Sequence, residues 1–163
     1  MPFTRFHFGP AILIGLLLLD YIDFPTFVAA NVIVDWRATL VFFGVIDGPL
    51  HSWPSTYPGA LLSAVLLGSV MLYLRPALAG HLREAGIKQE TSNLKIFAGA
   101  IAGVLLHVTL DAFHHPDIQP FLVDGFRPLL GLLSTYEVRA ASVAALLLCF
   151  PVYFLHLWRD KAS

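Results

Sequence analysis

The sequence has few charged residues and almost no cysteine. Only 13% of its 163 residues are charged, against about 25% in a typical soluble domain, and 57% are hydrophobic. Ten lysines and arginines against eleven aspartates and glutamates leave a formal net charge of -1, so no basic field is present to bind nucleic acid. The single cysteine, Cys149, excludes an internal disulfide and a cysteine-based zinc site. An integral membrane protein is the class that fits this composition.

Long apolar runs predict the membrane-spanning helices. A bilayer core about 30 Å thick needs roughly 20 apolar residues of helix. The candidate spans are residues 6–21, 26–45, 58–74, 94–113 and 136–158. The first could just cross a locally thinned bilayer, and the apolar stretch 126–134 is too short to cross. We therefore expect one all-α domain, an integral membrane bundle of four to five transmembrane helices with one short re-entrant or interfacial segment.

The basic residues predict an orientation in the cell (inner) membrane. Six lysines and arginines lie in residues 75–95 and in the C-terminal tail. Only Arg5 and Arg127 lie in the segments that five spans would place on the other side. Because cytoplasmic loops carry an excess of basic residues, we expect the N-terminus outside and the C-terminus in the cytoplasm.

Histidines and carboxylates gather on the outer side of this topology. Ionisable groups at membrane depth cost at least about 2.5–3.5 kcal/mol each, so they persist where they are paired, hydrated or metal-bound. The gathered residues are His7, Asp47, His51, His107, Asp111, His114, His115 and Asp117. The orientation was inferred from lysine and arginine alone, so this gathering is an independent observation.

A histidine and an aspartate in the fourth long run have the spacing of metal ligands. His107 and Asp111 are four residues apart and share one face of a helix. Asp35 could add a carboxylate from a neighbouring helix, and Pro116 should end the helix so that the residues on either side of it, His115 or Asp117, fold back over the site. Imidazole and carboxylate together favour zinc, with manganese or iron as alternatives, over calcium.

Structural interpretations of the same residues are also possible. Asp35 could form an ion pair with Arg37, although a separation of two residues does not place them on one helical face. The pair His107–Asp111 could be one interhelical hydrogen bond that only holds the bundle together. His114 and His115 could be interfacial side chains, and Asp47 could be a turn residue before a Gly-Pro pair.

Several short motifs occur in a characteristic order. They are TRFHFG at 4–9, VIVDW at 32–36, LHSWPST at 50–56, HVTLDAF at 107–113, HPDIQPF at 115–121 and PLLGLLS at 128–134. This ordered set, which covers about residues 4–134, resembles the YdjM-like family of membrane-bound metal-dependent hydrolases. The resemblance implies a helical membrane protein with a metal-dependent hydrolytic activity.

The leading hypothesis is a hydrolase of an amphiphilic ester, a phospholipid or a prenyl phosphate, in contact with membrane lipids. The expected metal ligands are His7, Asp35, His51, His107 and Asp111. Asp117 or His114 would transfer protons, and Arg127 would stabilise developing negative charge. A non-catalytic membrane subunit or assembly factor with a structural His/Asp cluster is the alternative, and such a chain could pair with a second copy or another membrane protein. A transporter, which a broken helix near Asp35 would indicate, and a haem carrier are further alternatives.

Overall fold

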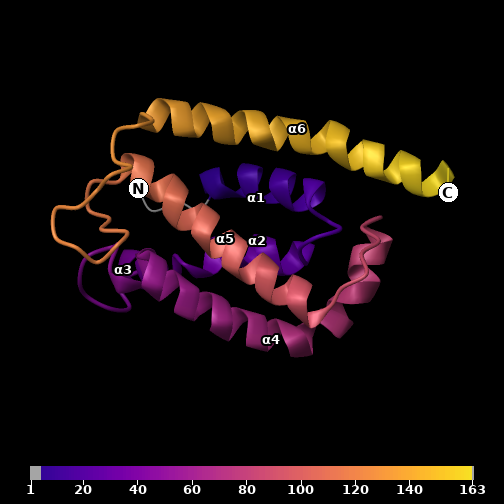
Figure 1. Ribbon diagram of the computed structural model, residues 1–163, viewed down its shortest axis with the longest axis horizontal. Helices are drawn as coiled ribbons and strands as arrows, with labels where there is room; N and C mark the ends of the chain where they lie inside the picture. Colours follow the sequence, from indigo (N-terminus) through magenta and orange to yellow (C-terminus); the bar gives the residue numbers. More distant parts are fainter. Residues whose placement is uncertain (1–4, 163) are drawn as a thin grey trace.

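The computed structural model describes residues 5–162, and the side chains of residues 6–159, as helices joined by loops, with no strand in that part of the chain (Figure 1). The elements are α1 (Arg5–Leu17), α2 (Phe24–Ile33), α3 (Trp36–Phe42), η1 (Trp53–Ser55), α4 (Tyr57–Glu84), α5 (Asn93–His114) and α6 (Thr135–Ala162). The all-α prediction is thereby confirmed.

Three of these helices are long and apolar enough to cross a membrane, namely α4, α5 and the part Thr135–Arg159 of α6. Their number is smaller than the four to five spans expected, because the first two apolar runs form short helices. With 13 residues, α1 is about 20 Å long, and α2 has only 10 residues. The three long helices are consistent with a membrane protein.

The run 26–45, expected as one span, is broken in the middle. The first piece, α2, ends at Ile33, and α3 begins at Trp36. Asp35 occupies the N-cap position of α3 but makes no side-chain capping hydrogen bond. Its carboxylate lies instead beside His107 of α5, at 3.2 Å. The helix is therefore interrupted at the residue whose side chain contacts α5. Hydropathy alone could not indicate this interruption.

The end of α4 also differs from the expectation. The helix runs through Pro76 to Glu84, well beyond the predicted end at residue 74. Arg75, counted with the basic loop residues, is buried in this helix and donates from Nε to Asp23 Oδ1 at 2.6 Å. Arg75 is therefore not one of the basic loop residues from which the orientation can be predicted. Asp23 also caps α2, because its Oδ2 accepts a hydrogen bond from Thr26 N at 3.3 Å.

The short α1–α2 hairpin lies between α6 on one side and α4 on the other, and α5 crosses it (Figure 1). Small residues allow this close packing. A Cβ atom at Gly103 of α5 would lie only 2.6 Å from the carbonyl oxygen of Phe27 in α2. A Cβ at Gly9 of α1 would meet the carbonyl oxygen of Ser142 in α6. Such approaches are typical of packed membrane helices.

One end of the bundle collects the segments that carry histidine and aspartate. The start of α1, the α2–α3 break, the loop before α4 and the end of α5 meet there, at the left in Figure 1. The segment 126–134, expected as a re-entrant or interfacial piece, forms turns at this end. Its Gly131 N–H donates to the carbonyl of Phe113 at 2.9 Å, which ties the segment to the end of α5.

Candidate metal centre

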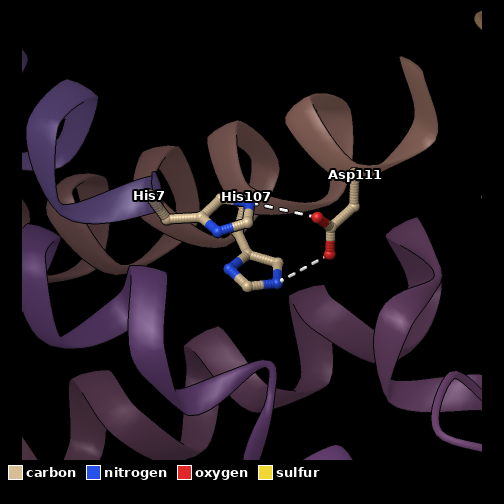
Figure 2. A group of neighbouring side chains, drawn as sticks. All are labelled: His7, His107 and Asp111. Carbon is tan, nitrogen blue, oxygen red and sulfur yellow. Dashed lines mark ion pairs between the residues drawn. The ribbon is translucent and has the colours of Figure 1, made fainter. Parts of the chain in front are cut away.

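Asp111 is the carboxylate around which the cluster is arranged (Figure 2). It is 2% exposed, and its Oδ1 lies 3.1 Å from Nε2 of His7 on α1. Its Oδ2 lies 3.1 Å from Nε2 of His107, one turn earlier on α5. The two imidazole rings stack with their centroids 4.2 Å apart. Two imidazoles and one carboxylate, from two helices, thus converge in a buried place where their ligand atoms lie within 4.8 Å of one another.

His107 is held in one orientation by the backbone of α2. Its Nδ1 lies 2.7 Å from the carbonyl oxygen of Asn31, and because a carbonyl only accepts, Nδ1 donates. In a neutral ring, Nε2 then presents a lone pair, and the groups nearest to it are the carboxylates of Asp111 and Asp35, at 3.1 and 3.2 Å. Histidine ligands of metals commonly have their second ring nitrogen hydrogen-bonded in this way.

The buried nitrogen atoms at the centre lack ordinary hydrogen bonds. Nε2 of His107 and Nε2 of His7 each lie 3.1 Å from an Asp111 oxygen without the geometry of an ordinary hydrogen bond, and Nδ1 of His7 has no partner among the described residues. Leaving a buried polar group unsatisfied costs about 1–3 kcal/mol. Two buried carboxylates near each other add repulsion that a cation would remove. The residues at this place therefore fit a divalent metal ion.

His51, in the loop before η1, lies close to Asp35 and Asp111. Its Nδ1 lies 2.7 Å from Oδ2 of Asp117, and since a carboxylate only accepts, Nδ1 donates and Nε2 is left as the nitrogen able to bind a metal. One ring nitrogen of His51 and one oxygen each of Asp35 and Asp111 lie within 4.8 Å of one another, and all three residues are buried. The five ligands that the sequence predicts therefore lie together.

The residues after α5 fold back over the cluster, as Pro116 led us to expect. The helix ends at His114, and Nε2 of His115 lies 3.8 Å from Oδ1 of Asp111. The ring centroids of His115 and His51 are 4.7 Å apart. Residues His51, His115 and Asp117 form a further group that could hold a metal ion, as do Asp111, His114 and His115.

Two groups at the exposed edge of the cluster, His115 and Asp117, have shifted pKa values. Burial lowers the pKa of His115 to about 4, and the Asp111 carboxylate opposes this without reversing it, so the imidazole is neutral at pH 7. Burial alone would raise the pKa of Asp117, but the hydrogen bond and charge of His51 together bring it below its ordinary value. Asp117 is therefore ionised at neutral pH, with about half of its side chain exposed.

The remaining predicted residues lie at the edge or apart from the centre. His114 Nδ1 donates to the carbonyl of Leu110 at 2.9 Å, and its ring contacts that of His115. Asp47 belongs to none of the metal-binding groups formed by the described residues. No hydrogen bond or ion pair joins the Arg127 side chain to the cluster in the described part of the chain, and its buried Nε has no partner.

Sequence reasoning missed His115 as a candidate ligand, although it placed this residue near the site. The signal was present in Pro116, which ends α5 and turns the next residues back. Thr4 of the first motif lies outside the described residues. The chain matches no family model, no curated protein and no solved structure.

Proposed function

We propose that this protein is a membrane-bound, metal-dependent hydrolase. The observation that carries the proposal is the buried convergence on Asp111 of two imidazoles, whose facing nitrogens both lie 3.1 Å from its carboxylate oxygens, with the Asp35 carboxylate beside them. The ordered motifs that resemble the YdjM-like family of membrane-bound metal-dependent hydrolases support the same assignment. Zinc is the metal we expect, with manganese and iron as alternatives.

The chain supplies a rigid ligand set. His7, His107 and Asp111 would hold the cation, and the Asn31 carbonyl keeps the His107 ring turned toward it. A bound divalent ion would supply Lewis acidity and would lower the pKa of a water molecule from about 15.7 to about 7.

Side chains at the exposed edge of the cluster would transfer protons. Asp117 is ionised and half-exposed, so it can exchange protons with water. His114 keeps Nε2 available for a proton, because Nδ1 is used by the Leu110 carbonyl. Arg127, whose buried Nε has no partner, is the side chain we expect to contact the anionic part of the substrate.

The surroundings of the cluster favour a lipid ester as substrate. The segment that follows Asp117 exposes several large apolar side chains: Phe121, Leu122, Val123, Phe126, Leu132 and Leu133. Exposed apolar groups of this kind typically contact a membrane or an apolar ligand. We infer that the substrate is a phospholipid or a prenyl phosphate that enters from the bilayer.

The test is hydrolysis by the purified full chain in lipid nanodiscs. Metal-depleted protein is supplied with zinc, manganese or iron, and phosphate or headgroup release is measured from phospholipid and prenyl phosphate substrates. We expect activity with metal, none with chelator, and none in His107→Ala or Asp111→Asn. Asp124→Asn, an exposed loop carboxylate in none of the metal-binding groups, is the matched control and should keep full activity. Full activity in a His107→Ala, Asp111→Ala double variant would contradict the proposal.

A structural role for the cluster is the second candidate. The hydrogen bonds His107–Asn31 and His51–Asp117 join α5, α2 and two loops, as a non-catalytic membrane subunit would need. Metal analysis separates the candidates, since a metal-free sample of unchanged thermal stability favours the structural role. The helix break at Asp35 is a feature that a transporter also has, and metal uptake into proteoliposomes would favour that function.

A further inference from the structure

Asp111 has neighbours on two sides. Oδ2 faces His107, while Oδ1 lies 3.1 Å from His7 Nε2 and 3.8 Å from His115 Nε2. The same carboxylate also belongs to the buried group with Asp35 and His51. A carboxylate has two oxygens and about four acceptor positions, so it can bind two cations at once.

The residues around Asp111 offer more ligand atoms than one metal ion binds. A catalytic zinc ion uses three protein ligands, at about 2.0–2.2 Å, and keeps one position open. The buried residues divide into two such sets, His7 with His107 and Asp111, and Asp35 with His51 and Asp111. Each set is complete without the other except for the shared Asp111.

In each set, one histidine donates a hydrogen bond from Nδ1 to an oxygen atom. His107 donates from Nδ1 to the Asn31 carbonyl, and His51 donates from Nδ1 to Asp117, at 2.7 Å in both cases. In each ring Nε2 is left for a metal. This repeated arrangement is the usual support of a metal-binding imidazole, and one ion would explain only one of the two.

We propose that the site holds two divalent cations, one bound by His7, His107 and Asp111 and the other by Asp35, His51 and Asp111, with the Asp111 carboxylate as the bridge. Two-ion sites have the metals about 3.5–4 Å apart and occur in many enzymes that act on phosphate esters. Asp117 then also orients His51 through their hydrogen bond, while Asp117 and His114 remain the proton carriers.

The charge of the centre supports the second ion, in a step that rests on the proposed hydrolysis of a phosphate ester. One divalent ion just neutralises the two buried carboxylates, Asp35 and Asp111. A second divalent ion leaves a net positive charge that attracts an anionic phosphate. The number of bound ions itself does not depend on any hydrolytic activity.

The test is the metal content of the full chain in nanodiscs. Metal-depleted protein is equilibrated with Zn²⁺ and, separately, with Mn²⁺, and bound metal is counted by mass spectrometry. We expect two ions per chain in the wild type, one in Asp35→Asn, His51→Ala and His7→Phe, and two in the control His156→Ala near the far end of α6. The Mn²⁺ protein should give the electron paramagnetic resonance spectrum of a coupled pair, and Asp35→Asn should give that of an isolated ion.

Asp35→Asn keeps the size of the side chain, so it tests the proposal even if His51→Ala loosens its loop. One ion per chain in the wild type would overturn the proposal and would leave hydrolysis by a single ion possible. Loss of an ion in His115→Ala together with its retention in Asp35→Asn would also overturn it, because the group of His51, His115 and Asp117 would then hold the ion. Two ions without any lipid hydrolysis would support the two-ion site while contradicting the proposed function.

Discussion

Replacement of His7 by phenylalanine separates a metal ligand from a packing residue. His7 is 6% exposed, its ring stacks on that of His107, its Nε2 lies 3.1 Å from Oδ1 of Asp111, and its Nδ1 has no partner among the described residues. Phenylalanine keeps a stacking ring and removes the unpaired Nδ1, which costs about 1–3 kcal/mol when buried, but it also removes the contact with Asp111. In metal-free protein these two effects oppose each other, so the melting temperature of His7→Phe should stay within about 2–4 °C of the wild type.

The response of the same variant to metal should differ from that of the wild type. A cation present at 100 times its dissociation constant stabilises the folded state by about 2.7 kcal/mol. Changes at groups that merely support a ligand weaken metal binding about 10–100-fold, and loss of a ligand should weaken it at least as much. If the affinity falls 100-fold, the gain from this ion at the same concentration falls to about 0.4 kcal/mol. Most of the metal-induced rise in melting temperature from this ion should disappear.

The assay is thermal unfolding of nanodisc-embedded protein, followed by tryptophan fluorescence, with chelator and with added zinc. His156→Phe, the same exchange at a half-buried histidine outside the cluster, is the control and should keep the full response to metal. An unchanged metal-induced shift in His7→Phe would refute the assignment of His7 as a ligand. A strong destabilisation of the metal-free variant would show that the imidazole makes a structural contact.

Three further predictions concern packing and metal. Gly103→Ala should destabilise the protein by about 1–3 kcal/mol in thermal unfolding, because its Cβ would press on the Phe27 carbonyl, whereas Gly80→Ala, where nothing lies within 4 Å, should be neutral or stabilising. Arg75→Met should cost about 3–5 kcal/mol, because it leaves the Asp23 carboxylate buried without its partner, and adding Asp23→Asn should restore most of this stability; failure of the double variant to recover would contradict the pairing. Chelation should lower the melting temperature of the wild type and leave that of Asp111→Asn unchanged; equal shifts in both would place the stabilising metal elsewhere.

Local spacing accounts for what the sequence predicted correctly. His107 and Asp111 meet because residues four apart share a helical face, and Pro116 ends α5. Each of these outcomes is decided within a few residues of chain. The all-helical fold follows from long apolar runs, which are also local.

The features that the sequence did not predict depend on contacts between distant segments. Hydropathy is continuous across residues 26–45, so it cannot indicate that Asp35 turns toward His107 and divides the helix. Arg75 follows an apolar run and was assigned to a loop, whereas the structure pairs it with Asp23 inside the bundle. A charged residue of this kind ends a span in a hydropathy profile, and only the position of its partner shows that the helix continues.

The composition of the cluster argues for a cation more strongly than its compactness does. A cluster whose only role was to hold helices together would need one hydrogen bond between each pair of helices and no additional buried charges. Well-packed apolar groups can often replace a buried ion pair with no loss of stability. Here His107 Nε2 faces two carboxylates, His7 Nε2 faces one of the same two, and Nδ1 of His7 has no partner among the described residues. Such an arrangement is costly without a cation and becomes stabilising when one binds. The metal-free protein should therefore be the less stable form, and binding energy and the order of the cluster should rise together as metal is added.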